Sequence, residues 1–215
     1  MNTHIAILGN APGFERAPWQ NPAWEMWALN DAYLSLAPAH MGRVTRWFEL
    51  HQNTALTQHR RPANHWLTLA ALGIPVYTFA RLPRIEHQVL YPLEAIERAM
   101  PRAYFACTFS YQIALALFEG ATAIGLYGTP LVGNREALVE RPCVEWWLGY
   151  AEGKGVTIHV DHNESEGLMT HEYQYAKDDP HERMTTFHYV LQHQRYLTDW
   201  LMREACRLDV AKSEP

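Results

Sequence analysis

The stretch HIAILGNAPGFE, residues 4–15, decides the fold of this chain. It joins a short apolar run, typical of a buried strand, to a Gly-Asn-Ala-Pro-Gly turn. Such a turn is expected to present free backbone N–H groups and the Asn10 amide where a phosphate or nucleotide can bind. Gly9 and Gly13 do not fit the dinucleotide fingerprint Gly-x-Gly-x-x-Gly. A turn in which the two glycines and Pro12 only shape the backbone is the alternative.

Strand-like and helix-like apolar patterns alternate along most of the chain, which predicts an α/β fold with a mostly parallel sheet flanked by helices. We expect strands at residues 4–8, 25–29, 44–50, 76–79, 123–127 and 156–160. We expect helices at residues 64–72, 93–100, 110–119 and 144–152. Pro142 is expected near the start of the last helix, and Gly153 and Gly155 are expected to end it.

The chain after the last predicted strand breaks this alternation. Residues 161–183 are polar and lack a period, which predicts either a lid that orders on ligand binding or an idle surface loop. In residues 184–215, apolar side chains recur at three- and four-residue steps. This predicts a long amphipathic helix that packs on the sheet or on a partner subunit, as in a homo-oligomer. We expect one domain, with its core in residues 1–160.

Composition narrows the class of protein. With 215 residues, 48% of them hydrophobic, the chain is long enough to bury a substantial core. Its net charge of −5 gives no general attraction to nucleic acid. Three scattered cysteines without a CxxC pair argue against a disulfide framework and fit a reducing compartment. No apolar stretch approaches the roughly 20 residues that span a bilayer, so we expect a cytoplasmic protein without a membrane partner.

Polar residues gather where the predicted strands end. In a parallel sheet, ligands bind beyond the carboxyl ends of the strands. The residues at the ends of four of these strands, or at the start of the helix before the last of the four, are small, amide, hydroxyl or ionisable: Gly9, Asn10, Gly13, Asn30, Asp31, Glu49, His51, Thr108, Ser110, Gly128 and Thr129. This convergence predicts one shared ligand site.

Glu49 and His51 are candidates for catalysis. They occupy alternate positions at the end of a predicted strand, so both side chains point to the same face. Histidine is the usual residue for proton abstraction near neutral pH, which suggests a general base. A structural histidine bonded to the backbone is the alternative. The histidines after residue 158 lack the spacing of a metal site, so we expect no metal ion held by the protein.

Three segments resemble the bacterial sialyltransferases that use a CMP-activated sugar. They are GNAPG after the first strand, WALNDAY at residues 27–33, and CTFSYQIALALFEGATAIGLYGTPL at residues 107–131. The same layout is similar to archaeal-type pterin diphosphokinases and to a wider Rossmann-like group, many of them phage-encoded, with a Gly-Asn-x-Pro start. The resemblance implies a Rossmann-like fold. This chain departs from the sialyltransferase pattern at Gly13, Phe109 and Pro130, the last of which replaces an acidic residue.

The resemblance implies that Asn10 and Asn30 bind a nucleotide, that Thr108 faces its phosphate, and that Gly128 lets the ligand approach the backbone. We therefore expect a transferase that binds a nucleotide or nucleotide sugar, with glycosyl transfer as the leading reaction. Diphosphoryl transfer is an alternative and would require Mg²⁺ bound with the nucleotide. A protein that sequesters or senses a nucleotide without chemistry is the third hypothesis.

Overall fold

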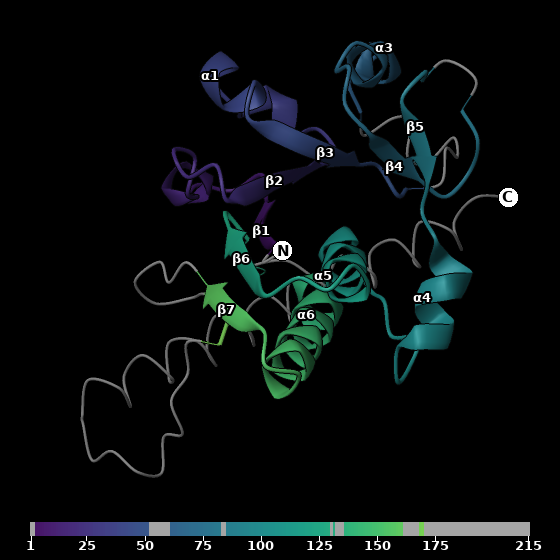
Figure 1. Ribbon diagram of the computed structural model, residues 1–215. Coiled ribbons are helices and arrows are strands. Elements are labelled where there is room, and N and C mark those ends of the chain that lie inside the picture. The colour runs from purple at the N-terminus through teal and green to yellow at the C-terminus, as the bar shows by residue number, and fades with distance from the viewer. Residues whose placement is uncertain are drawn as a thin grey trace, which may run out of the picture. The chain divides into compact units, whose positions relative to one another are not determined.

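The structure, a computed structural model, describes residues 3–51, 61–82, 85–129, 131, 136–160 and 168–169. Its centre is a seven-stranded sheet in which every pair of neighbouring strands is parallel (Figure 1). The strands are β1 (His4–Leu8), β2 (Trp24–Leu29), β3 (Val44–Phe48), β4 (Val76–Thr78), β5 (Gln88–Leu90), β6 (Ala123–Tyr127) and β7 (Thr157–Val160). They lie in the order β5-β4-β3-β2-β1-β6-β7. The predicted α/β fold with a parallel sheet is confirmed.

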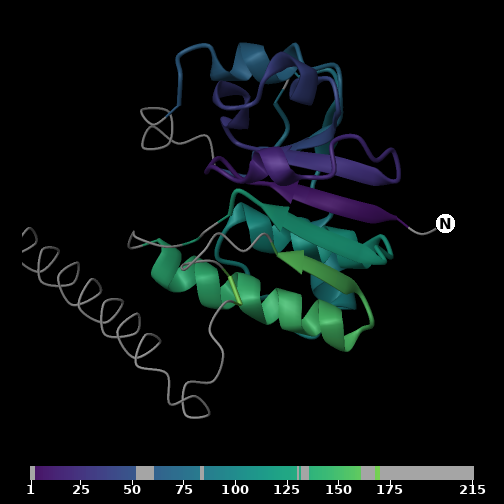
Figure 2. The ribbon, with the colours of Figure 1, turned by 90° about the vertical axis from the view of Figure 1, so that its left-hand side faces the viewer.

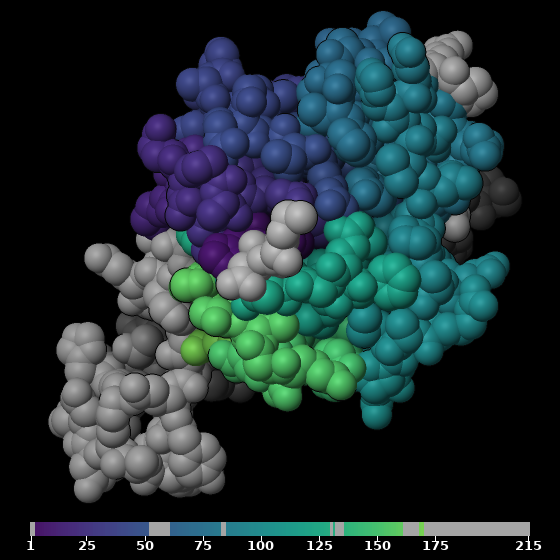
Figure 3. Space-filling view, in the orientation of Figure 1, coloured from purple at the N-terminus to yellow at the C-terminus, as the bar shows by residue number. Residues whose placement is uncertain are grey.

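Helices cover both faces of the sheet (Figures 1 and 2). One face carries η1 (Phe14–Arg16), η2 (Ala32–Leu34), α1 (Pro38–Met41) and α3 (His65–Ala70). The other carries α4 (Leu93–Ala99), α5 (Thr108–Phe118) and α6 (Ala137–Gly153). In the space-filling view, the early elements, purple to blue, and the teal to green helices α5 and α6 lie on different sides of the molecule (Figure 3).

Two hydrophobic cores form because strand side chains alternate between the faces. Ile5 and Ile7 of β1 pack with α5 and α6, whereas Ala6 and Leu8 face η1 and its neighbours. All four residues are fully buried. A strand covered on both sides must be apolar at every position, which explains the continuous run that begins the chain.

The strand order reverses direction at β1. From β1 the chain moves outward through β2, β3, β4 and β5, and then returns to place β6 on the other side of β1. At such a switch point, the connections leave β1 and β6 toward opposite faces, and ligands usually bind there in sheets of this topology. The turns that begin at Gly9 and Gly128 lie at this point.

The structure departs from the sequence-based elements in several places. β3 ends at Phe48 rather than at residue 50, so Glu49 and His51 follow the strand. The short helices η1, η2 and α1 were not predicted. The short strand β5 was not predicted.

Helix α6 begins at Ala137, seven residues before the predicted start at residue 144, so Pro142 lies inside the helix. Proline cannot donate a hydrogen bond to the carbonyl four residues earlier, that of Leu138. The carbonyl of Leu138 belongs to the first turn, and Leu138 is 37% exposed, so water can replace the missing hydrogen bond. The helix therefore continues through Pro142.

The predicted lid, apart from residues 168–169, and the predicted C-terminal helix lie outside the described residues. Of the helices that the structure describes, none combines the length and the apolar composition needed to cross a membrane.

Candidate functional site

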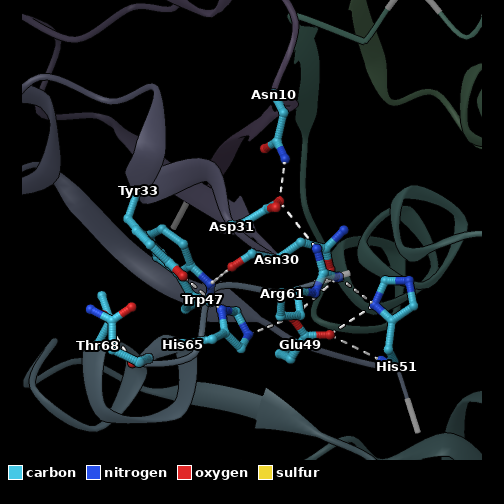
Figure 4. A network of polar contacts seen from close by, with 11 residues as sticks. Asn10, Asn30, Asp31, Tyr33, Trp47, Glu49, His51, Arg61, His65 and Thr68 are labelled. Atoms are coloured by element: carbon cyan, nitrogen blue, oxygen red, sulfur yellow. Dashed lines mark hydrogen bonds and ion pairs between the residues drawn. The ribbon is translucent and has the colours of Figure 1, made fainter. Parts of the chain in front are cut away.

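Glu49 lies at the centre of a polar network at the carboxyl end of β3 (Figure 4). Its side chain is 1% exposed. Oε1 lies 2.8 Å from Nδ1 of His51, and Oε2 lies 3.0 Å from Nε2 of His65. A third contact joins Oε2 to the guanidinium of Arg61 at 3.4 Å. The Glu49 carboxylate thus contacts three side chains that can donate hydrogen bonds, and it holds them in place.

The surroundings of Glu49 keep it ionised. Burial alone raises the pKa of this carboxyl group, but hydrogen bonds from His51 and His65 and the charge of Arg61 outweigh burial and lower the pKa to about 2. At neutral pH the carboxylate therefore accepts hydrogen bonds and donates none.

His51 is the exposed member of the network. Its side chain is 45% exposed, in contrast to that of Glu49. Nδ1 of His51 lies 2.8 Å from Oε1 of Glu49, which can only accept a hydrogen bond, and 3.0 Å from the guanidinium of Arg61, which can only donate one. In the neutral tautomer that donates to Glu49, Nδ1 carries the proton and Nε2 has the free lone pair. Nε2 makes no hydrogen bond to any residue that the structure describes. The contact with Glu49 has the geometry of a base that a buried carboxylate orients, and Arg61 approaches the same ring nitrogen.

A second arm of the network runs into the protein. His65, on α3, is 1% exposed, and its Nδ1 lies 2.9 Å from the hydroxyl of Tyr33. Burial, followed by the charge of Asp31, raises the pKa of Tyr33, so the phenol keeps its proton and donates it to His65. His65 in turn donates from Nε2 to Glu49. This chain of hydrogen bonds fixes the orientation of the Glu49 carboxylate.

Arg61 connects the network to the neighbouring strand ends. Its guanidinium lies 3.1 Å from Oδ1 of Asp31, which follows β2. The same Oδ1 accepts a hydrogen bond of 2.7 Å from the amide of Asn10, which follows β1. Asn10, Asp31, Arg61 and Glu49 thus form a continuous polar path across the carboxyl ends of β1, β2 and β3 (Figure 4).

Asn30 has a constrained backbone and a buried side-chain oxygen. Its φ of 51° is the left-handed conformation that asparagine tolerates better than most residues. Its backbone N–H bonds to Phe48, and its carbonyl accepts from Nε1 of Trp47. The side-chain Oδ1 is buried and has no hydrogen-bond partner among the described residues. An unpaired acceptor at a strand end is a candidate contact for a ligand.

The N-terminal turn differs from the expectation of free N–H groups. The N–H of Gly9 donates to Tyr127, that of Ala11 donates to Gly128, and that of Gly13 donates to the carboxylate of Glu15 at 2.8 Å. Hydrogen bonds from the backbone N–H groups of Glu15 itself and of Gly13 lower the pKa of the Glu15 carboxyl group. The N–H of Gly13 therefore binds an internal carboxylate.

Gly9 and Gly128 are needed where two turns pack together. A Cβ at Gly9 would overlap the carbonyl oxygen of Gly128, and a Cβ at Gly128 would overlap that of Ala11. Gly128 also has a positive φ of 65°. This packing accounts for both glycines, and their assignment as ligand contacts stays a prediction.

The first turn of α5 lies on the same side of the sheet as the strand ends. Because α5 leads through Ala121 into the amino end of β6, its N-terminus lies toward the carboxyl edge. Thr108 is its first residue. The hydroxyl of Ser110 donates to the carbonyl of Cys107 at 2.6 Å and accepts from backbone N–H groups, so it caps the helix. A ligand contact of Ser110 stays a prediction.

Helix α6 brings a carboxyl group into electrostatic range of His51. Burial and the nearby Glu136 raise the pKa of Glu140, while the charge of His51 opposes both effects. Glu140 therefore holds its proton to higher pH than an exposed glutamate does.

Sequence reasoning placed Glu49 and His51 together correctly but missed Arg61 and His65 as members of the site. A histidine at the start of an otherwise apolar helix was the available signal for His65. No group of three or more His, Cys, Asp or Glu with metal-binding geometry occurs in the part of the chain that the structure describes. Comparisons of the chain with models of protein families, with curated proteins and with solved structures find no match.

Proposed function

We propose that this chain is a nucleotide-dependent transferase of Rossmann-like fold, in which His51 removes the proton of an acceptor hydroxyl. The observation that carries the proposal is the pairing of an exposed histidine with a buried, ionised carboxylate, 2.8 Å from its Nδ1, at the carboxyl edge of a parallel sheet. A surface histidine without a function needs no buried partner. Here the partner is a buried carboxylate whose desolvation is costly, and His65 and Arg61 hold it in place beside His51.

The fold supports a ligand that extends from the switch point to His51. The switch point between β1 and β6 is the usual place for a nucleotide in sheets of this topology. β3 lies two strands from β1, which is roughly 10 Å at the usual strand spacing. A nucleotide joined to a sugar is long enough to place its reacting carbon near β3 while its nucleoside remains near β1.

In the proposed reaction, Nε2 of His51 takes the proton of the acceptor hydroxyl. At the same time, the oxygen of that hydroxyl forms a bond to the anomeric carbon of the donor sugar. The bond between that carbon and the phosphate oxygen breaks, and the nucleotide leaves with the electron pair. The Glu49 carboxylate stabilises the imidazolium that forms. The Thr108 hydroxyl and the first N–H groups of α5 would stabilise the charge on the departing phosphate.

The test measures nucleotide release from CMP-, UDP- and GDP-activated sugars by wild-type protein and by His51→Asn. Asparagine keeps the approximate size and polarity but cannot act as the base, so turnover is expected to fall by roughly 10²- to 10⁴-fold with unchanged binding. The matched control is His87→Asn, because His87 is exposed and precedes β5 at the opposite edge of the sheet. Unchanged turnover in His51→Asn would exclude His51 as the base.

A further inference from the structure

Gln112, in the second turn of α5, carries a buried amide without a partner among the described residues. The residue is fully buried, and neither Nε2 nor Oε1 has a hydrogen-bond partner among the residues that the structure describes. Its neighbours Ile113, Leu115 and Ala116 are buried and apolar, as a helix packed on a sheet requires. Burying an amide without partners is unfavourable, so its presence here requires an explanation.

The geometry of α5 directs this amide toward the candidate site. Gln112 and Thr108 are four residues apart and therefore share one face of the helix. Side chains on a helix lean toward its N-terminus, so we expect the Gln112 amide to extend toward Thr108 and the carboxyl edge. The helix packs against β1, the strand that precedes Asn10.

Asn30 supplies a second unpaired atom at the same edge. Its Oδ1 is buried and follows β2, the neighbour of β1. Together, the two residues present two unpaired acceptors and one unpaired donor. A phosphate group offers only acceptors at neutral pH and would leave both oxygens without partners. The edge of a nucleobase, with an amino or imide N–H beside a carbonyl or ring nitrogen, offers both kinds of group.

We infer that Gln112 recognises the base of the bound nucleotide, with Asn30 accepting a further hydrogen bond from the nucleoside. This inference rests on the proposed function and names the nucleobase as the part of the ligand that the protein recognises. The nucleoside lies between α5 and the ends of β1 and β2, and its phosphate extends past Thr108 toward His51.

The test is calorimetric titration of the wild-type protein and Gln112→Met with four nucleoside monophosphates, ribose 5-phosphate and inorganic pyrophosphate. Methionine has a similar shape without the polar atoms. We expect the dissociation constant of the preferred nucleotide to rise by about 10- to 100-fold, while weak binding of ribose 5-phosphate is unchanged. Gln20→Met, at an exposed turn, is the matched control and is expected to change neither.

The melting temperature of the protein without ligand gives an independent readout. We expect Gln112→Met to raise it, although the same substitution weakens nucleotide binding. Because methionine removes an unpaired buried amide, the melting temperature of Gln112→Met without ligand is expected to rise by about 2–6 °C. A residue that only supports the fold would lower the melting temperature when replaced. Lower stability together with unchanged nucleotide binding would overturn the inference.

Two further outcomes separate this inference from the proposed function. Equal affinity of the wild-type protein for ribose 5-phosphate and for every nucleotide would overturn base recognition without any variant. Binding of a nucleotide that depends on Gln112, without turnover of any nucleotide sugar, would support base recognition and contradict the proposed transfer. Absence of binding to all nucleotides would overturn both.

Discussion

Glu49 links the chemistry of the site to the stability of the fold. It is buried and ionised, and its partners come from β3, from α3 and from the segment before α3. Removing its charge would leave the guanidinium of Arg61 with Asp31 as its remaining acidic partner in the network, and would leave the His51 ring with Arg61 as its remaining described side-chain partner. A buried carboxylate with several donors thus serves both as a structural centre and as the group that orients the base.

The lowered pKa of Glu49 predicts a specific dependence of stability on pH. A carboxyl whose pKa falls from 4.5 when unfolded to about 2 when folded stabilises the protein above pH 4.5, and this contribution is lost as the pH falls toward 2. It amounts to about 3 kcal/mol. Denaturant titrations between pH 5 and pH 2.5 should therefore show a difference between wild-type protein and Glu49→Gln that shrinks with acidification. A difference that stays constant would contradict the assignment.

A substitution at Asn10 distinguishes a role in ligand binding from a role in folding. It is exposed and has one described side-chain contact, its hydrogen bond to Asp31. Asn10→Ala is expected to weaken nucleotide binding by about 1–3 kcal/mol, because a desolvated ligand group would lose its partner, while the melting temperature stays nearly unchanged. Asn21→Ala, in an exposed turn before β2, is the control. Equal affinity with a large loss of stability in calorimetry and thermal melts would show that Asn10 only shapes its turn.

At the scale of elements, the switch point depends on close packing of the turns after β1 and β6. Gly128→Ala is expected to destabilise the protein by roughly 1–3 kcal/mol, because it combines a positive φ with overlap on the Ala11 carbonyl. Gly149→Ala, inside α6 where nothing lies within 4 Å of a new Cβ, is expected to stabilise it by roughly 0.5–1 kcal/mol. Chemical denaturation of both variants measures these opposite effects, and equal effects would contradict the packing argument.

The sequence predicted the central elements better than the peripheral ones. β1 and β6 occupy the predicted residues because strands covered on both faces are apolar throughout. β5 has three residues, none fully buried, and carries little hydrophobic signal. Helix α6 starts early because Pro142 is tolerated inside it, whereas proline was expected near a helix start.

The same distinction applies to the candidate site. Glu49 and His51 are two residues apart, so a strand expected to reach residue 50 was enough to pair them, although β3 ends at Phe48 and both residues follow it. Arg61 and His65 reach Glu49 from 12 and 16 positions away along the chain. No local pattern encodes such contacts. The unpaired amide of Gln112 was also invisible in the sequence, because its significance lies in its burial.

At the scale of the whole molecule, the two edges of the sheet differ in chemistry. The candidate groups follow β1, β2, β3 and β6 or open α5, all at the carboxyl edge. The connections that enter β4, β6 and β7 at the amino edge carry Gly73, Gly120 and Gly155, each at positive φ with nothing within 4 Å of a new Cβ. The carboxyl edge thus carries the Glu49 network, whereas the amino edge carries these turns and the ion pairs of Arg46 with Glu25 and Glu119.

This asymmetry predicts how a nucleotide changes hydrogen exchange across the fold. Binding to the carboxyl edge should slow exchange in residues 9–13, 30–34 and 107–112, because ligand contacts reduce local opening there. Residues 73–75, 120–122 and 154–156 at the amino edge serve as internal controls and should exchange at an unchanged rate. Mass spectrometry with and without a saturating nucleoside monophosphate measures both sets. Protection that is uniform, or greatest in the amino-edge turns, would place the ligand away from the strand ends and remove the basis for a reaction at His51.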